Sequence, residues 1–180
     1  MNKKASNKVF FKQCSLNKKL MFAFSKCIVP ISVGIHVHEG EKFLETMRLI
    51  NAHFQECTLL IDDSIQRYTM KIENPNLQLD DLHIKAVQLG DEWIERNKHN
   101  YNILTIPYNI MRWDNWRNHR DFNEFYKVIE KRYNDDVMFK QAIHDNISDF
   151  IKDRYLNVDQ SHAFNCCLKY LMFRNLERLV

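Results

Sequence analysis

The most promising chemical group in this sequence is a serine, Ser32, in a segment that joins a predicted strand to a predicted helix. Residues 31–43 read ISVGIHVHEGEKF and hold two of the chain's three glycines, Gly34 and Gly40. A serine at the carboxyl end of a strand directs its hydroxyl toward the crevice where parallel sheets bind ligands. A nearby glycine permits close backbone approach, and the free N–H groups of a following helix stabilise an oxyanion. On this pattern alone a plain turn serine is the more common explanation, and a nucleophile is the alternative that the chemistry allows.

A second polar segment follows the apolar run at residues 57–61. We expect Asp62 and Gln66 to line the same crevice as Ser32, because both come just after a predicted strand. Adjacent carboxylates such as Asp62 and Asp63 usually diverge, so capping and pocket lining are favoured over paired acid–base work.

Two other clusters are better explained as structure. His36, His38 and Glu39 resemble metal ligands, but no further Cys or His stands at ligand spacing, so no metal site is predicted. The segment 112–116, RWDNW, is rich in aromatic residues. Core aromatics and a helix N-cap at Asp114 explain it at least as well as substrate contact.

The elements that must position these groups alternate between strand and helix. Residues 39–54 carry one apolar stripe at helical spacing, and 80–96 is a second helix. The predicted strands are 26–33, 57–61 and 103–106, and the later helices are 114–133, 136–155 and 160 to the end. This order predicts an α/β fold with a Rossmann-like parallel sheet and flanking helices.

Composition excludes several classes. The chain has 180 residues, 45% of them hydrophobic and 27% charged, which is typical of a globular domain. Three glycines are too few and too far apart for a phosphate-binding loop, so P-loop ATPases and standard dinucleotide-binding proteins are excluded. Five cysteines without a CxxC motif indicate free thiols in a reducing compartment. We therefore expect a cytoplasmic protein with no membrane contact and no cofactor. The oligomeric state stays open, with a monomer favoured.

The charge is uneven along the chain. Seven lysines precede Glu39, and no Asp or Glu does. We therefore expect a basic N-terminal arm at residues 1–25, followed by a single domain at 26–180. Such an arm is typical of proteins that bind an anionic partner, most often a nucleic acid, and a solvated terminus is the alternative.

Four segments taken together resemble the tRNA-dependent cyclodipeptide synthases. They are ISVGIHVHEGEKF at 31–43, DDSIQRYTM at 62–70, GDEWIERN at 90–97 and RWDNW at 112–116, and they keep the family's order and spacing. Ile35 stands where one subfamily has an Asn, so the chain is similar to the other subfamily. The resemblance implies a Rossmann-like fold similar to the catalytic domain of class I tyrosyl- and tryptophanyl-tRNA synthetases.

The resemblance also implies a reaction and its residues. An aminoacyl group passes from its tRNA to Ser32, a second aminoacyl-tRNA reacts by ping-pong transfer, and the dipeptidyl ester cyclises to a diketopiperazine. Tyr170 is the residue that positions the amine. The implied substrate-binding residues are Gly34, Ile35, Asp62 and Gln66. The implied tRNA-binding residues are Lys85, Arg96 and Lys98. Because both substrates are activated esters, neither ATP nor a metal is required.

Two departures from the family pattern give an alternative. The fourth residue after Tyr170 is Arg174 where the family has a Glu, and Glu177 lies three residues further on. The sequence also stops at Val180, before the family's Tyr-Pro pair, and so looks truncated. A guanidinium repels the substrate ammonium that a carboxylate would hold. The alternative is a catalytically inactive homologue that at most binds aminoacyl-tRNA.

Overall fold

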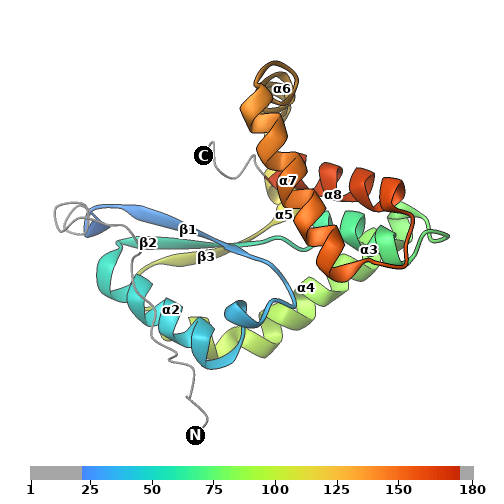
Figure 1. Cartoon of the computed structure of the whole chain (residues 1–180). Helices are drawn as coiled ribbons and strands as arrows, with labels where there is room; N and C mark the ends of the chain where they lie inside the picture. The colour runs from blue at the N-terminus through green and yellow to red at the C-terminus, as the bar shows by residue number, and fades with distance from the viewer. Residues whose placement is uncertain (1–21, 175–180) are drawn as a thin grey trace, which may run out of the picture. The chain divides into compact units, whose positions relative to one another are not determined.

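The computed structural model describes residues 22–174 (Figure 1). They form two compact units, each built from two stretches of chain. Within the described part, the first unit contains residues 22–62 and 89–112, and the second contains 63–88 and 113–174. Most of the predicted basic arm, residues 1–21, lies outside the described residues.

The first unit contains a parallel three-stranded sheet in the order β1-β2-β3. The strands are β1 (Lys26–Ile31), β2 (Glu56–Ile61) and β3 (Tyr108–Arg112). Ile31 is in register with Ile61, and Ile61 with Arg112, so all three strands end at the same edge. Helices flank this sheet, which confirms the predicted α/β class.

The apolar stripe of the first predicted helix packs on this sheet. Helix α2 (Gly40–His53) buries Phe43, Met47 and Ile50. These side chains share a core with Ile31 of β1 and Trp93 of helix α4 (Leu79–Tyr101). The 3.6-residue period of the stripe accounts for this, because it places all three side chains on one side of the helix.

The third strand differs from the prediction. Residues 103–106 form no strand, and β3 begins only after Pro107. The N–H of Cys57 donates to the carbonyl of Pro107 over 3.0 Å, so pairing with β2 starts there. The side chain of Asn51 accepts the N–H groups of Thr105 and Ile106 at 2.6 and 3.3 Å. Asn51, far away in sequence, therefore accepts the hydrogen bonds of backbone N–H groups that would otherwise pair with a neighbouring strand.

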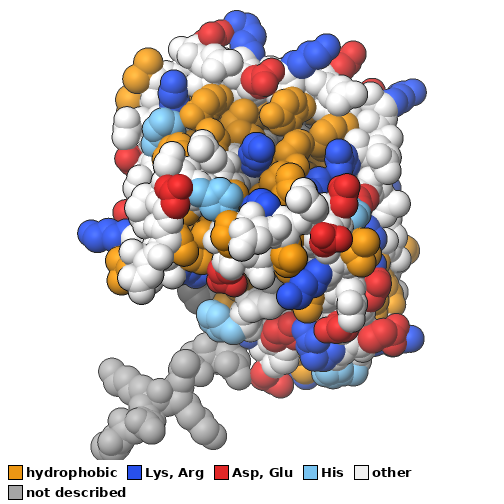
Figure 2. Space-filling view, turned by 90° about the vertical axis from the view of Figure 1, so that its right-hand side faces the viewer, with side chains coloured by type: hydrophobic (Ala, Val, Ile, Leu, Met, Phe, Trp, Pro, Cys, Tyr) orange, Lys and Arg blue, Asp and Glu red, His pale blue; other side chains and the backbone are white. Residues whose placement is uncertain are grey.

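The second unit is helical. It contains η2 (Ser64–Gln66), α3 (Arg67–Glu73), α5 (Trp113–Arg117), α6 (Phe122–Asp135), α7 (Val137–Arg154) and α8 (Gln160–Arg174), with the first part of α4. Helix α8 packs against α3, α6, α7 and η2. Seen from the side of α3 and α8, apolar side chains gather with Lys and Arg side chains beside them (Figure 2).

The single helix predicted over 114–133 is wrong. The chain forms α5 and α6 with a turn at 118–121 between them. Trp116 and Phe122, both buried, meet edge to face with ring centroids 6.3 Å apart. In one continuous helix, side chains six residues apart would point about 120° apart. Trp116 and Phe122 can therefore meet only because the chain turns between them. The local sequence pattern does not reveal this turn.

Candidate functional site

Ser32 stands directly after β1, at the carboxyl edge of the sheet. The strand ends at Ile31, two residues earlier than predicted, and Ser32 is only 7% exposed. The N–H of Ile35 donates to the carbonyl of Ser32 over 3.3 Å, which closes a tight turn. Within this turn Gly34 has a φ of 81°, a left-handed conformation that favours glycine. The local sequence thus bends sharply just after the serine.

Asp62 lies beside Ser32 at the same edge. Their preceding residues, Ile31 and Ile61, are register partners in β1 and β2. The N–H of Asp62 donates to the carbonyl of Ile31 over 2.8 Å, and Asp62 is fully buried. Because adjacent parallel strands run about 4.8 Å apart, the structure brings these two predicted site residues together.

His38 contacts the backbone of Ser32. The N–H of Ser32 donates to Nδ1 of His38 over 2.9 Å, and the same ring nitrogen lies 3.3 Å from the carbonyl oxygen of Ser32. His38 ends the short 3-10 helix η1 (His36–His38), and its own carbonyl accepts the indole N–H of Trp93 over 3.0 Å. The sequence pattern suggested only a metal-ligand interpretation for this histidine and did not indicate this contact.

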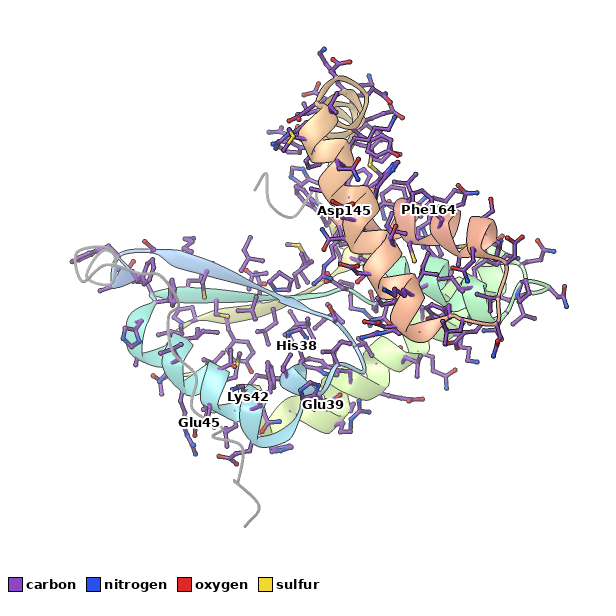
Figure 3. All side chains as sticks on the ribbon, viewed as in Figure 1. His38, Glu39, Lys42, Glu45, Asp145 and Phe164 are labelled. Atoms are coloured by element: carbon purple, nitrogen blue, oxygen red, sulfur yellow. The ribbon has the colours of Figure 1, made fainter. Side chains whose placement is uncertain are left out.

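Glu39 follows His38 at the start of α2 and joins this segment to α4 (Figure 3). Its carboxylate accepts hydrogen bonds from Arg96 and from Asn97, each over 2.8 Å. Partial burial opposes ionisation of Glu39, but these hydrogen bonds outweigh it and hold the pKa of the carboxyl below its ordinary value. Arg96, a predicted tRNA-binding residue, is thus engaged in an ion pair within the first unit.

The other two predicted tRNA-binding residues lie on α4. Lys98 is 59% exposed and its Nζ lies 3.9 Å from a carboxylate oxygen of Glu95, a loose pair. Lys85 is exposed and lies on the part of the helix that belongs to the second unit. Both ammonium groups therefore face solvent.

A polar network fills part of the second unit. Arg67, only 6% exposed, donates to the carbonyl of Ser64 over 3.2 Å and to Nδ1 of His83 over 2.8 Å. Nε2 of His83 lies 3.3 Å from Asp114, whose other oxygen accepts the hydroxyl of Ser64 over 2.8 Å. A His83 ring with its proton on Nε2 satisfies both contacts. The network connects η2, α4 and α5.

This network corrects one prediction. Asp114 lies inside the first turn of α5 and binds Ser64 and His83, so its predicted capping role is wrong. The capping role predicted for Asp63 is confirmed, because its carboxylate accepts the N–H of Ser64 over 2.7 Å. Spacing alone could not connect Ser64 with Asp114, since they stand 50 residues apart.

Tyr170 and Gln66 belong to the second unit. Tyr170 is half-buried on α8, and Gln66 ends η2, against which α8 packs. Arg174, one turn after Tyr170, places its guanidinium carbon 5.9 Å from the centre of the Tyr170 ring. A cation therefore stands over the predicted amine-positioning tyrosine. Glu177 lies outside the described residues.

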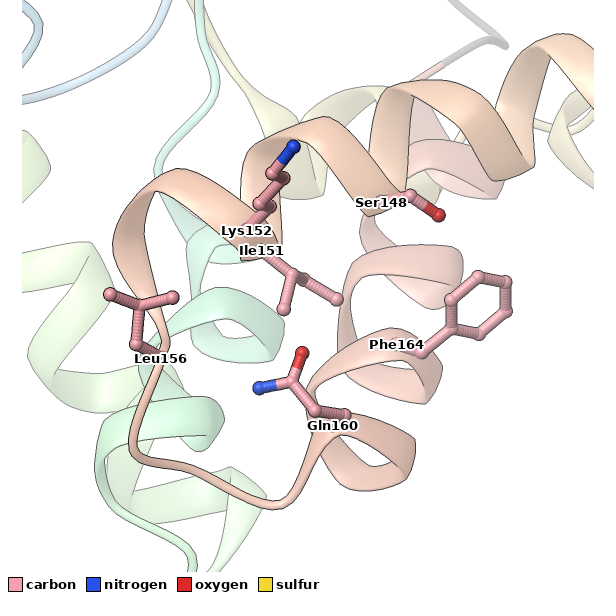
Figure 4. Close-up of a pocket in the computed structure, with 6 residues that line it drawn as sticks. All are labelled: Ser148, Ile151, Lys152, Leu156, Gln160 and Phe164. Carbon is pink, nitrogen blue, oxygen red and sulfur yellow. The ribbon is translucent and has the colours of Figure 1, made fainter.

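A shallow pocket of about 400 Å³ opens between α7 and α8 (Figure 4). It is lined by Ser148, Ile151, Lys152, Leu156, Gln160 and Phe164. None of the predicted site residues is among them. This pocket is therefore lined by other residues than those that the sequence predicts for the functional site.

Within residues 22–174, no helix has the length and apolar character that crossing a membrane requires. No three or more His, Cys, Asp or Glu side chains in this range are grouped so that they could hold a metal ion.

The chain is similar to a solved structure with which it shares substantial sequence identity. A cyclodipeptide synthase (CDPS) from Fluoribacter dumoffii superposes with a TM-score of 0.89 at 43% identity, covering 94% of this chain and 76% of that chain. No protein-family model and no curated protein matches the sequence.

More distant structures share the fold. The cyclodipeptide synthase from Candidatus Glomeribacter gigasporarum, solved with Phe-tRNAPhe, has a TM-score of 0.68 at 17% identity and covers 86% of this chain and 72% of that chain. A Mycobacterium tuberculosis protein, whose structure relates cyclodipeptide synthetases to type I tRNA synthetases, has a TM-score of 0.68 at 10% identity over 90% and 70%. These matches confirm the predicted Rossmann-like class. Because the Fluoribacter protein is 43% identical over most of both chains, this protein belongs to the cyclodipeptide synthase family.

Proposed function

We propose that this chain joins the aminoacyl groups of two aminoacyl-tRNAs into a diketopiperazine, with Ser32 as the nucleophile. The observation that carries the proposal is the match to a cyclodipeptide synthase at 43% identity and a TM-score of 0.89. The position of Ser32 supports it, since a buried serine directly after β1, beside Asp62, stands where parallel α/β sheets bind ligands.

The chemistry needs only groups that this chain carries. The Ser32 hydroxyl attacks the ester carbonyl of an aminoacyl-tRNA, a bond forms from Oγ to that carbon, and the tRNA oxygen leaves with the proton. The α-amine of one aminoacyl group then attacks the ester carbonyl of the other. This forms the peptide bond and breaks that ester, whose oxygen leaves with the proton lost by the amine. The free amine of the dipeptidyl ester closes the ring and releases the last ester oxygen. The protein contributes positioning and charge stabilisation.

The turn after Ser32 would form one wall of the substrate site. Gly34 and Ile35 lie on it and are exposed, and Gly34 carries no side chain that would block an incoming ester. In the first unit, Asp62 is the proposed polar contact for the substrate amine, because a carboxylate accepts hydrogen bonds from an ammonium. Gln66, in the second unit, stays a proposed substrate-binding residue, because its amide oxygen is also an acceptor.

Tyr170 would position the amine through its phenolic oxygen. The cation of Arg174 over its ring disfavours a second positive charge nearby, so the substrate amine would bind there more readily in its neutral form. Only the neutral amine is nucleophilic. Arg174 in the place of the family's Glu is therefore compatible with aminoacyl transfer, although it weakens binding of an ammonium.

The macromolecular partner we propose is aminoacyl-tRNA. The relative from Candidatus Glomeribacter gigasporarum was solved with Phe-tRNAPhe. In this chain the exposed ammonium groups of Lys85 and Lys98 on α4 are the proposed phosphate contacts. Arg96 would join them if it exchanged the carboxylate of Glu39 for a phosphate.

The test is expression of the chain in bacteria, followed by mass spectrometry of the medium. The host supplies every aminoacyl-tRNA, so the amino acids need not be known beforehand. We expect a diketopiperazine that is absent from the empty vector and from Ser32→Ala, a variant that lacks only the hydroxyl. A folded wild-type chain that yields no diketopiperazine would contradict the proposal and favour an inactive homologue.

A further inference from the structure

The N–H of Ser32 is held by a side chain, not by the backbone. It donates to Nδ1 of His38 over 2.9 Å, across the turn that contains Gly34. Hydrogen bonds within a local turn usually join backbone groups. Here an imidazole six residues downstream sets the position of the backbone on which the Ser32 hydroxyl is mounted.

His38 is itself anchored from two sides. Its carbonyl accepts the indole N–H of Trp93 over 3.0 Å, and Trp93 is fully buried against Phe43. The next residue, Glu39, is tied to α4 by hydrogen bonds from Arg96 and Asn97. The imidazole is therefore mounted on backbone that cannot shift without disturbing the core of the first unit.

The contact requires one protonation state. Nδ1 accepts the Ser32 N–H only when its lone pair is free, that is, in the neutral ring with its proton on Nε2. In the imidazolium both ring nitrogens carry protons, so Nδ1 loses this bond. It then has the carbonyl of Ser32, 3.3 Å away, as its acceptor. Protonation thus changes the hydrogen-bond partner of His38 Nδ1 from the N–H of Ser32 to the carbonyl oxygen of Ser32.

We propose that neutral His38 is a positioning residue for the Ser32 nucleophile. The inference rests on the proposed function, because it presumes that Ser32 attacks an ester. Without the acceptor, the Ser32 N–H is released and the hydroxyl loses its fixed direction. Such displacements cost a nucleophile on the order of 100-fold in rate.

Several charged and titratable groups lie around this histidine. Glu39 follows it, with Arg96 of α4 paired to Glu39, and the charge of His38 acts on the Glu39 carboxyl. His36 precedes it on η1, Lys42 belongs to α2, which packs against η1, and Asp62 follows β2 beside Ser32. The midpoint of the pH dependence therefore reports this whole set of charges.

Two substitutions of His38 separate positioning from bulk packing. His38→Phe keeps a ring and removes the acceptor. His38→Asn places an amide oxygen near the position of Nδ1, and this oxygen accepts at every pH. His36→Asn, at the exposed first residue of η1, is the matched control. Thermal melting establishes that each variant is folded.

The readout is the steady-state rate of diketopiperazine synthesis from purified aminoacyl-tRNA between pH 5.5 and 8. We expect the wild-type kcat to fall toward the acid end of this range, as His38 becomes protonated. His38→Phe should lower kcat by about tenfold or more with little change in KM. His38→Asn should restore most of the rate and remove the histidine-dependent fall, whereas His36→Asn should behave as wild type.

The outcomes distinguish the two proposals. A wild-type chain that makes product while His38→Phe keeps its full kcat, or while His38→Asn is as slow as His38→Phe, overturns the role of His38 alone. A folded wild-type chain without product overturns the proposed function and this inference with it. Hydrogen exchange at the Ser32 amide provides an activity-independent measurement. It should be faster in His38→Phe, and an unchanged rate contradicts the inference.

Discussion

The guanidinium of Arg174 lies over the ring of Tyr170, with 5.9 Å between the guanidinium carbon and the ring centre. The pair is formed within one helix, α8, at the spacing of about one turn. It places a positive charge where the resemblance to the family predicts a carboxylate.

Replacing this cation should improve catalysis. In Arg174→Glu a carboxylate would attract the substrate ammonium that the guanidinium repels, and we expect diketopiperazine synthesis to rise about tenfold, which corresponds to about 1.4 kcal/mol. Arg174→Gln, which removes the charge without reversing it, should give a smaller rise. Rates with purified aminoacyl-tRNA test this. A slower Arg174→Glu would mean that Arg174 itself binds a substrate group.

The ion pair of Glu39 should make stability depend on pH. A carboxyl with a lowered pKa stabilises the fold only while it is ionised, so its contribution is present above its unfolded value of 4.5 and is lost as the pH falls through the lower folded value. Arg96 is 52% exposed, so solvent screens the pair and we expect only about 0.5–1 kcal/mol.

Urea unfolding of wild type and Glu39→Gln measures this contribution. The variant should be less stable at pH 7 and equal to wild type at a pH below the folded pKa. Glu41→Gln is the control, because Glu41 is 54% exposed and its oxygen lies 3.5 Å from Arg48. Equal loss in both variants would show that the Arg96 pair has no special contribution.

Trp93 should be the most sensitive residue of the first unit. Trp93→Phe removes the hydrogen bond to the His38 carbonyl and reduces the volume that packs against Phe43, so we expect a loss of about 2 kcal/mol in the free energy of unfolding. Ile84→Ala, at a 67% exposed position of the same helix, should change stability by less than about 0.5 kcal/mol. Chemical denaturation compares them, and similar losses would contradict this assignment.

The lysines of α4 should act through salt-sensitive contacts. Lys85→Gln should weaken the binding of all tRNAs alike, whatever their nucleotide sequence. It should also reduce the magnitude of the slope of log affinity against log salt concentration by about one. Arg96→Gln should affect stability more than affinity, because Glu39 already engages the guanidinium. Filter binding at several salt concentrations measures both. An unchanged slope in Lys85→Gln would remove this residue from the tRNA interface.

The sequence predicted the elements whose signals are local. The stripe of Phe43, Met47 and Ile50 has helical period and forms the buried face of α2 as predicted. The strand predicted at 57–61 is β2, extended by one residue. These patterns are reliable because each element alone must bury one continuous apolar face.

The predictions that were wrong or missing share a different cause. Each concerns a feature that depends on contacts with residues elsewhere in the fold. The third strand was predicted too early because Asn51 satisfies the backbone of Thr105, 54 residues away. The break between α5 and α6 depends on the meeting of two rings in the folded core. The same holds for the contact of His38 with the Ser32 N–H, which requires a particular turn and a particular ring tautomer.

The most direct test of the central claim is the intact mass of the purified chain after brief mixing with aminoacyl-tRNAs charged with all amino acids and an acid quench. If Ser32 is the nucleophile, wild type gains the mass of an aminoacyl group, fragmentation places it on Ser32, and Ser32→Ala gains nothing. An adduct that persists in Ser32→Ala, or a folded wild-type chain without any adduct, would contradict the assignment.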